Sequence, residues 1–477
     1  MSSSEKREKR VAVVGGGIAG LTAAFTIRQR CPDAHIDLFE ASSRFGGAIE
    51  TEQASGFLVE RGADMFATEP AAGLELCKEL GIENELITPL PGARGAAIVQ
   101  NGKLIRIPEG FVLMRPTLIW PMLRTPLLSL AGKLRLLAEP FVAKRGEIAD
   151  ESIESFVTRR LGRETLDRIV QPLVGGIYTG DVAKLSMAAT MSQFWDMEQR
   201  DGSLYRATTR RSREGADSAE QNSAGARYEK FRSFPTGMGR FAEELTKRLD
   251  DRHLHLNARV QSLVKTGEDW KLTWTTGDDG SLVDSVFSHV IVATPARIAA
   301  KLLADVVPEA SRELEAIRFA SSAVVVFGVR EADIEQQLAI AGFIVPIQQR
   351  RKIIAVSFTG DKFAGRTPQG YKLLRVFIGG ELQPELLSLS DSQLVDLAKD
   401  ELKELIGLRG EPVMTKVVRW NDAMPQYHVG HVQRLKVIQA AIDQHRGLSL
   451  IGNSLHGVGI APTIAYARKV AMAVAAE

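Results

Sequence analysis

The sequence predicts a mixed α/β protein with an open parallel sheet, a second mixed sheet and a helical insertion. Three observations support this fold class. A glycine-rich turn follows a short apolar run at residues 11–14. Further strand-like runs occupy residues 323–329, 343–346, 353–358 and 373–377. Between these regions, residues 110–143 are apolar with scattered arginines and prolines, which favours short helices over long strands.

The first strand and its turn are typical of a Rossmann-like dinucleotide-binding unit. Gly15, Gly17 and Gly20 have the G-x-G-x-x-G spacing. The first glycine makes the tight turn, the second admits a pyrophosphate to the backbone, and the third brings helix and strand close together. A second strand at 36–39 ends in Glu40, where an acid hydrogen-bonds a ribose hydroxyl. The alternative interpretation is an ordinary tight turn and a surface glutamate.

Composition narrows the class of protein. The 477 residues provide about three domains' worth of core, and Lys+Arg 60 against Asp+Glu 58 leaves no strong field for nucleic acid. Cys31 and Cys77 lack metal or disulfide spacing, which indicates a reducing compartment. Residues 1–10 lack an apolar signal segment, so we expect a cytoplasmic location. The uncharged stretch 447–467 is punctuated by glycine and proline, and we predict no transmembrane helix there.

Later motifs turn this general pattern into a specific resemblance. The run G-G-G-I-A-G-L at 15–21 is followed by E-A-S-S-R-F-G-G at 40–47 and E-R-G-A-D-M-F at 60–66. A further run, P-L-V-G-G-I-Y-T-G-D-V-A-K-L-S, occupies 172–186 and is the most discriminating. Together they resemble the FAD-dependent protoporphyrinogen/coproporphyrinogen III oxidase family of the flavin amine oxidase superfamily. The resemblance covers nearly the whole chain.

The resemblance implies a division into domains. Residues 1–68, 228–300 and 418–477 are expected to form a discontinuous Rossmann-like FAD-binding domain. Residues 69–98 and 301–417 are expected to form a mixed-sheet substrate-binding domain. Residues 99–200 are expected to form a helical subdomain, either a plain core or a membrane-facing surface, and 201–227 a flexible loop.

The same resemblance implies which residues contact FAD and substrate. The last strand and helix return to the cofactor, and the helix N-terminus is expected to face the flavin. In the run 172–186, interpreted as a glycine-rich loop, Gly176 would let the macrocycle approach the backbone. Arg44 is a candidate phosphate ligand. The predicted FAD contacts are Gly15, Gly16, Gly17, Ile18, Ala19, Gly20, Glu40, Ala41, Arg44, Gly47, Ala48, Gly62, Ala63, Asp64, Met65, Val260, Asn453, Val458, Gly459 and Ile460.

The resemblance also implies an activity. A porphyrinogen would be oxidised to a porphyrin for haem biosynthesis, with oxygen as acceptor and hydrogen peroxide as product. Coproporphyrinogen III is favoured over protoporphyrinogen IX, and product transfer to ferrochelatase and peripheral contact with the inner face of the cell membrane are further expectations. We predict no catalytic acid–base residue and no metal site. The alternatives are a flavin amine oxidase, a phytoene-desaturase-like enzyme, or a non-catalytic flavin- or tetrapyrrole-binding protein.

Overall fold

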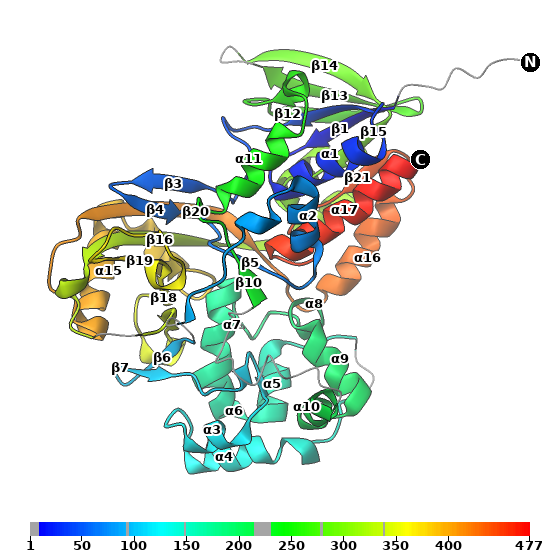
Figure 1. Cartoon of the computed structure of the whole chain (residues 1–477). Coiled ribbons are helices and arrows are strands. Elements are labelled where there is room, and N and C mark those ends of the chain that lie inside the picture. The colour runs from blue at the N-terminus through cyan, green and yellow to red at the C-terminus, as the bar shows by residue number, and fades with distance from the viewer. Residues whose placement is uncertain (1–8, 92–94, 147–148, 214–229, 277–279, 337–338) are drawn as a thin grey trace, which may run out of the picture.

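A computed structural model describes residues 9–91, 95–146, 149–213, 230–276, 280–336 and 339–477. Figure 1 shows three regions: a parallel sheet with its helices at the top, a mixed sheet at the left, and a helical body at the bottom. The helices in the part of the chain described include none long and apolar enough to cross a membrane.

The five-stranded sheet is entirely parallel and is assembled from distant parts of the chain. Its order is β11-β2-β1-β15-β21. The strands are β1 (Arg10–Val14), β2 (His35–Phe39), β11 (Leu254–His255), β15 (His289–Val292) and β21 (Leu448–Leu450). The burial of β1 on both faces explains its continuous apolar run.

Helices cover one face of this sheet, and a small antiparallel sheet together with further helices covers the other. The first face carries α1 (Ile18–Arg30), α2 (Ala72–Leu80), α11 (Gly239–Lys247) and α17 (Ile460–Ala476). The second carries β12 (Val260–Thr266), β13 (Asp269–Thr276), β14 (Ser281–Phe287), α12 (Ala296–Leu303), α13 (Pro308–Glu315) and α16 (His431–Ile442).

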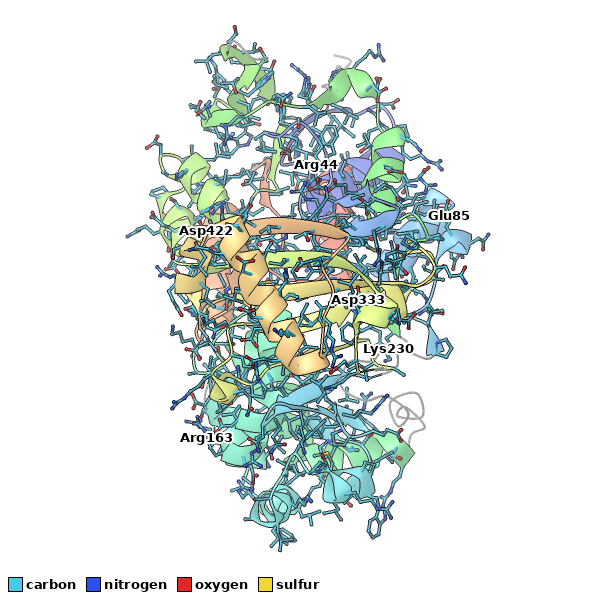
Figure 2. The ribbon with its side chains drawn as sticks, turned by 90° about the vertical axis from the view of Figure 1, so that its left-hand side faces the viewer. Arg44, Glu85, Arg163, Lys230, Asp333 and Asp422 are labelled. Atoms are coloured by element: carbon cyan, nitrogen blue, oxygen red, sulfur yellow. The ribbon has the colours of Figure 1, made fainter. Side chains whose placement is uncertain are left out.

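The seven-stranded sheet has the order β20-β16-β19-β18-β17-β6-β7 and is antiparallel except where β17 meets β6. Helix α15 (Asp391–Ile406) crosses one face (Figure 2), and the hairpin of β3 (Thr51–Ala54) and β4 (Phe57–Glu60) packs on the other. The seven strands are β6 (Ala97–Gln100), β7 (Lys103–Arg106), β16 (Arg318–Arg330), β17 (Gly342–Ile344), β18 (Ala355–Phe358), β19 (Tyr371–Gly379) and β20 (Met414–Gln426).

The helical body is tied together by buried charge. Arg160 on α5 is fully buried, with Nε 2.8 Å from Glu198 Oε1 and Nη1 3.2 Å from Glu139 Oε1. Because both carboxylates share one guanidinium, α5, α9 and the turn at 139–141 are held in one arrangement. The helices are α3 (Ile119–Arg124), α4 (Leu130–Leu137), α5 (Ile153–Leu161), α6 (Arg163–Thr165), the π-helical turn η4 (Leu166–Val170), α7 (Gln171–Tyr178), α8 (Met187–Thr190), α9 (Ser192–Asp201) and α10 (Leu204–Arg213).

Further short elements lie within and between these three regions. They comprise two-residue strand pairs, one short helix and several 3-10 turns. They are β5 (Phe66–Ala67) with β10 (Phe231–Arg232), β8 (Phe111–Val112) with β9 (Arg115–Pro116), α14 (Thr359–Lys362), η1 (Glu83–Glu85), η3 (Glu139–Phe141), η6 (Asp251–His253), η7 (Glu331–Asp333), η8 (Ile347–Gln349) and η9 (Pro384–Ser388).

Two local predictions were wrong. The glycine-rich run after residue 171 does not begin as a loop, because Gln171–Tyr178 is helix α7, and Gly176 lies within it. The predicted flexible loop 201–227 begins with helix α10, whose Leu204, Ala207 and Thr208 are buried. Few large aliphatic residues are needed there, since the short apolar face meets an existing core. Residues 214–227 lie outside the described residues.

Two predicted domain boundaries also fall inside structural units. The boundary at 418 divides β20, a continuous strand that pairs with β16 along its length. The boundary between 98 and 99 divides β6, whose hairpin with β7 forms the edge of the seven-stranded sheet. Backbone pairing therefore extends the mixed sheet beyond both predicted limits. Both limits are set by pairing between distant strands, which local sequence patterns do not mark.

Candidate cofactor and substrate site

Three distant segments meet at the carboxyl edge of the parallel sheet. Gly15 has a φ of 111°, and its N–H donates to the carbonyl of Phe39 over 2.7 Å. A Cβ on Gly15 would lie 2.9 Å from the Ala293 carbonyl oxygen at the end of β15. Gly452, which follows β21, faces the Thr294 carbonyl. Open α/β sheets bind ligands at this edge.

The three motif glycines have different surroundings. A Cβ on Gly20 would lie 1.9 Å from the Gly15 carbonyl oxygen, so this glycine allows α1 to pack tightly on the turn. A Cβ on Gly16 would strike the Phe45 ring. Gly17 differs, since the nearest atom to its Cβ position is Gly47 Cα at 3.9 Å. Gly17 therefore opens onto free space at the start of α1, whose N-cap has no side-chain hydrogen bond.

A second glycine turn faces the first. The N–H of Gly46 donates to the carbonyl of Gly16 over 2.8 Å, and Gly17 and Gly46 form an isolated bridge. Gly47 is exposed with a φ of 57°, and a Cβ there would lie 3.1 Å from Gly17 Cα. Ala48 is likewise exposed. The two backbones form a cradle without side chains, which fits a pyrophosphate above a helix N-terminus.

Glu40 and Arg44 stabilise this cradle through hydrogen bonds and an ion pair. The Glu40 carboxylate accepts the N–H of Gly16 and that of Ser42, each over 2.8 Å. Each oxygen keeps a lone pair for a ribose hydroxyl. The Arg44 guanidinium donates to the Gly47 carbonyl over 2.7 Å and pairs with Glu50 over 2.7 Å. These contacts fix the conformation of the loop. They also occupy guanidinium N–H groups of Arg44 that were expected to bind a phosphate.

The loop at 62–66 rests on buried charges. Asp64 is buried, with Oδ2 lying 3.0 Å from Lys362 Nζ and 3.6 Å from Arg375 Nη1. Burial would raise the pKa of Asp64, but the two cations outweigh it and hold that pKa below its usual value. Gly62 packs on the Ala48 carbonyl so closely that no side chain fits. The loop is therefore fixed against the second glycine turn.

The predicted flavin-contacting residues of the tail lie in the loop before α17. Gly459 is the N-cap of α17 and offers no side-chain acceptor to the first N–H groups of the helix. Asn453 presents its carbonyl to the Tyr427 hydroxyl, and Val458 packs against the helical-body core. Ile460 begins the helix.

The remaining predicted contacts lie around these turns. Val260 begins β12, where the register with β13 shifts before Ser262. The structure brings residues from the three segments to one edge of the sheet, while their individual roles in binding remain proposals. Besides the residues described above, Ile18 and Ala19 lie in the first turn of α1, Ala41 is exposed beside Glu40, and Ala63 and Met65 are half-buried neighbours of Asp64.

The discriminating run at 172–186 packs against the seven-stranded sheet. A Cβ on Gly176 would lie 3.3 Å from Ile344 Cγ2 on β17. The Gln426 amide at the end of β20 donates to the Tyr178 carbonyl over 2.9 Å, and Gly180 leaves room for that amide. Ile344 and Val458 both pack against the helical-body core. Gly176 thus lies on the seam between helical body and mixed sheet.

Sequence reasoning missed several residues that support the site. Lys362 and Arg375 are isolated cations in sequence, and their pairing with Asp64 spans about 300 residues of chain. Tyr427 precedes α16 and His431 is the first residue of that helix, and their stacked rings support the tail loop. The i, i+4 spacing of two aromatic rings is a weak signal, typical of any helix end.

A glycine cradle at the carboxyl edge of a parallel sheet, beside an acid that ends the second strand, defines a dinucleotide-binding α/β protein. The open backbone at Gly17 and Gly47 fits the FAD pyrophosphate. Residues 18–475 match the model of the flavin-containing amine oxidoreductases. The chain belongs to this family of flavin-dependent oxidoreductases, which confirms the predicted superfamily and FAD as cofactor.

Individual relatives match this chain along nearly their whole length. The chain is 32% identical to coproporphyrinogen III oxidase of Bacillus subtilis (strain 168), covering 95% of each chain. It is 27% identical to protoporphyrinogen oxidase 2 of Arabidopsis thaliana, covering 97% of this chain and 93% of the relative. The predicted resemblance to porphyrinogen oxidases is thereby confirmed.

Solved structures agree with the fold. A crystal structure of an Exiguobacterium sp. 255-15 protein, proposed to be a protoporphyrinogen oxidase, superposes with a TM-score of 0.83 at 28% identity and full coverage of both chains. A reduced UDP-galactopyranose mutase superposes with a TM-score of 0.71 at 15% identity, covering 98% of this chain and 95% of the other. The second likeness is one of fold.

Proposed function

We propose that this chain is an FAD-dependent oxidase that converts coproporphyrinogen III to coproporphyrin III with oxygen as acceptor, releasing hydrogen peroxide. One observation carries the choice of substrate. Three bacterial coproporphyrinogen III oxidases are 30–32% identical to the chain over at least 95% of it, whereas the plant protoporphyrinogen oxidases are 25–28% identical. Protoporphyrinogen IX is the second candidate substrate.

The chain's own residues bind and orient in this proposal. The turns at Gly17 and Gly47 leave backbone open to the pyrophosphate, and Glu40 offers its remaining lone pairs to the ribose. The N-terminus of α17, at Gly459, would place the positive end of the helix dipole where it stabilises negative charge on the reduced flavin. Bound FAD supplies the two-electron acceptor for dehydrogenation. In this proposal Gly176 admits the macrocycle at the seam between α7 and β17.

Arg351 is a cationic side chain near that seam, and its charge is already balanced by two glutamates. Its Nη1 lies 2.8 Å from Glu401 Oε2 and 2.9 Å from Glu404 Oε2 on α15. It also lines a small cavity with Gln171 and Thr179. Because its charge is compensated, we assign Arg351 no role as a propionate anchor, and propionates are proposed to reach solvent at the edge of the seam.

The decisive experiment mixes purified, FAD-loaded protein with substrate under anaerobic conditions. Coproporphyrinogen III should bleach the flavin absorbance, and admitting air should restore it together with porphyrin fluorescence. Protoporphyrinogen IX should react more slowly. Putrescine is the control for an amine oxidase: bleaching by putrescine alone would favour that alternative. A flavin that no substrate bleaches would indicate a non-catalytic binding protein.

We further propose that the helical body docks on a membrane surface. Large apolar side chains of α3, α4 and η3 are exposed, among them Phe141 with 89% of its surface exposed. Figure 1 shows α3 and α4 at the lower end of the molecule. Arg124 lies over the Trp120 ring, with 6.0 Å between its Cζ and the centroid, and Lys144 is exposed nearby in sequence. Apolar side chains flanked by cations suit an anionic lipid interface. The protruding side chains are Trp120, Leu130, Leu134, Leu137 and Phe141.

This location would place the protein in the cytoplasm at the inner face of the membrane. Delivery of the product to ferrochelatase belongs to the same proposal, because a metal-inserting enzyme is the reaction class that consumes a free porphyrin in haem synthesis.

A further inference from the structure

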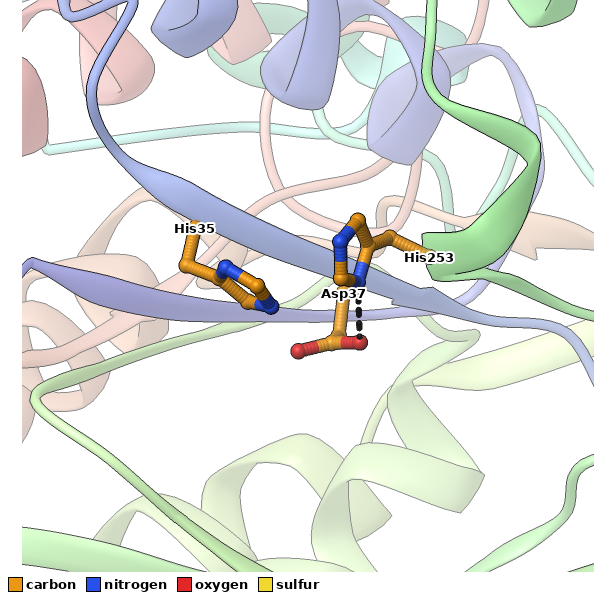
Figure 3. A group of neighbouring side chains, drawn as sticks. All are labelled: His35, Asp37 and His253. Carbon is orange, nitrogen blue, oxygen red and sulfur yellow. Dashed lines mark hydrogen bonds and ion pairs between the residues drawn. The ribbon is translucent and has the colours of Figure 1, made fainter.

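Three histidines and an aspartate gather at the outer edge of the parallel sheet. His35 and Asp37 lie on one face of β2 because side chains alternate along a strand. His253 ends the turn η6 that leads into β11, and His255 lies in β11, which pairs with β2. Figure 3 shows His35, Asp37 and His253 directed toward one another.

The distances within this histidine–aspartate cluster suit a shared ligand. Asp37 Oδ1 lies 3.2 Å from His253 Nδ1 and 2.8 Å from His255 Nε2. One donor atom from each of His35, Asp37 and His253 lies within 4.8 Å of the other two. In a tetrahedral zinc site with bonds of about 2.1 Å, donors are about 3.4 Å apart, so small side-chain rotations would complete the geometry.

We propose that His35, Asp37 and His253 bind one divalent transition metal ion, with Zn²⁺ the best match. Imidazole nitrogen and carboxylate oxygen are the donor types that zinc takes alongside thiolate, and a set of three leaves the fourth position to water. His255 orients the carboxylate through its hydrogen bond, the usual partner of a ligating group. The stacking of His255 on Phe39, with planes 14° apart, fixes its ring in that position.

The burial and exposure of the members are compatible with ion binding. Asp37 is only 8% exposed, and buried carboxylates are paired, hydrogen-bonded or bound to a metal ion. The side chains of His253 and His255 keep 21% and 30% of their surface exposed, so an ion can enter from solvent. The cluster lies outside the glycine cradle and has no part in the proposed oxidation.

A metal here would have a structural effect. Strand β11 is two residues long and is the first strand of the parallel sheet formed after the long excursion through the other two regions. The carbonyl of His255 accepts the N–H of Glu40 over 2.8 Å, and the Glu40 carbonyl accepts the N–H of Ala258. Cross-linking β2 to the turn before β11 would fix this return segment beside the ribose-binding acid.

The test measures metal content and metal-dependent stability of the full-length, FAD-loaded protein, purified without a histidine tag. After chelator treatment and dialysis against Zn²⁺, elemental analysis should find one equivalent per chain, and Zn²⁺ should raise the thermal midpoint. Cobalt should give visible ligand-field bands. Asp37→Asn and His253→Gln should lose the bound equivalent, and His255→Gln should bind about tenfold more weakly.

The matched control is His289→Gln. His289 also pairs with a carboxylate, its Nε2 lying 3.2 Å from Glu477 Oε2, but it lies outside the cluster. This variant should keep full zinc binding. Circular dichroism and flavin content establish that each variant is folded. The proposal is overturned if the unmodified protein shows neither retained zinc nor cobalt bands, or if folded Asp37→Asn binds zinc as tightly as the control does.

Discussion

The Lys362 ammonium lies 3.0 Å from the Asp64 carboxylate in a place where both side chains are almost fully buried. Arg375 approaches the same carboxylate at 3.6 Å and also donates to the Gly62 carbonyl. Lys362 ends α14 and Arg375 lies in β19, whereas Asp64 lies in the loop that was predicted to contact FAD. Helix α14 and the mixed sheet therefore hold, through buried charge, the loop that was predicted to contact FAD.

The first prediction concerns removal of that charge. Asp64→Asn would leave two buried cations uncompensated, so the free energy of unfolding should fall by about 3–5 kcal/mol, measured by urea denaturation. The double variant Asp64→Asn with Lys362→Met should recover part of the loss. Asp284→Asn, which breaks an exposed pair with Lys271, is the matched control. A loss of stability no greater than the control's would contradict the structural role.

The same pair predicts a direction of pH dependence. Because the pKa of Asp64 is lowered in the folded state, the unfolded chain binds a proton first as the pH falls. Its stabilising contribution is complete above the ordinary value of 3.8 and is lost as the pH falls through the lower folded pKa. Acid unfolding of Asp64→Asn should accordingly be less steep below that point.

Two glycine substitutions in the cradle should distinguish an effect on cofactor binding from an effect on folding. A Cβ on Gly17 meets only Gly47 Cα, at 3.9 Å, whereas one on Gly20 would overlap the Gly15 carbonyl oxygen at 1.9 Å. Gly17→Ala should therefore fold and lose FAD, read from the flavin absorbance of the purified protein. Gly20→Ala should lose stability, by about 3 kcal/mol, because backbone must move.

Gly146→Ala is the control for both glycine substitutions. Its Cβ position has no atom within 4 Å and its φ is not in the left-handed region. This variant should match the unmodified protein in flavin content and thermal midpoint. A Gly17→Ala protein that retains stoichiometric FAD would show that the pyrophosphate lies elsewhere.

Local patterns in the sequence predicted the parallel sheet and its glycine turn well. Gly20 packs against the nearby Gly15 carbonyl, and Gly15 has the positive φ expected of the tight turn, so both predicted roles agree with the observed backbone. Strands β1 and β2 and the final helix α17 were likewise marked by apolar runs and by Pro462 in the first turn of that helix.

What the sequence did not reveal depends on contacts between distant segments. Helix α7 contains Gly175 and Gly176, which locally indicate a loop, but packing against β17 and the helical core stabilises the helix. Asp37 and His253 are 216 residues apart, so no spacing rule could join them. The ends of β20 are set by pairing with β16, which a local propensity cannot predict.

The exposed apolar surface gives a binding prediction. Replacing Trp120, Leu130 and Phe141 together with serine should abolish cosedimentation with vesicles that contain phosphatidylglycerol, because these side chains are 72%, 75% and 89% exposed. Flavin content and porphyrinogen turnover in detergent should be unchanged. Leu282→Ser is the matched control, since Leu282 is 66% exposed on β14 at the other end of the molecule. Equal vesicle binding by the triple variant would rule out docking through this face.

The support of the tail loop predicts a second pH effect, near neutrality. His431 is 1% exposed, its ring stacks on Tyr427 with centroids 4.0 Å apart, and its Nε2 lies 3.2 Å from the Leu455 carbonyl. Burial lowers the pKa of His431 to about 4, so the folded protein holds it neutral while the unfolded chain protonates near 6.5. Stability should therefore fall as the pH drops from about 6.5 to about 4, by roughly 3 kcal/mol for this group.

This effect is measured as the free energy of unfolding by urea at a series of pH values. His431→Gln should be less stable at neutral pH, because a stacked ring is lost, and should show a smaller decline on acidification. His445→Gln, a histidine whose ring lies 6.2 Å from that of Trp270, is the control and should keep the original slope. An unchanged slope in His431→Gln would mean that acid sensitivity arises elsewhere. A reduced slope with earlier loss of flavin would link the Tyr427–His431 stack to the loop that precedes α17.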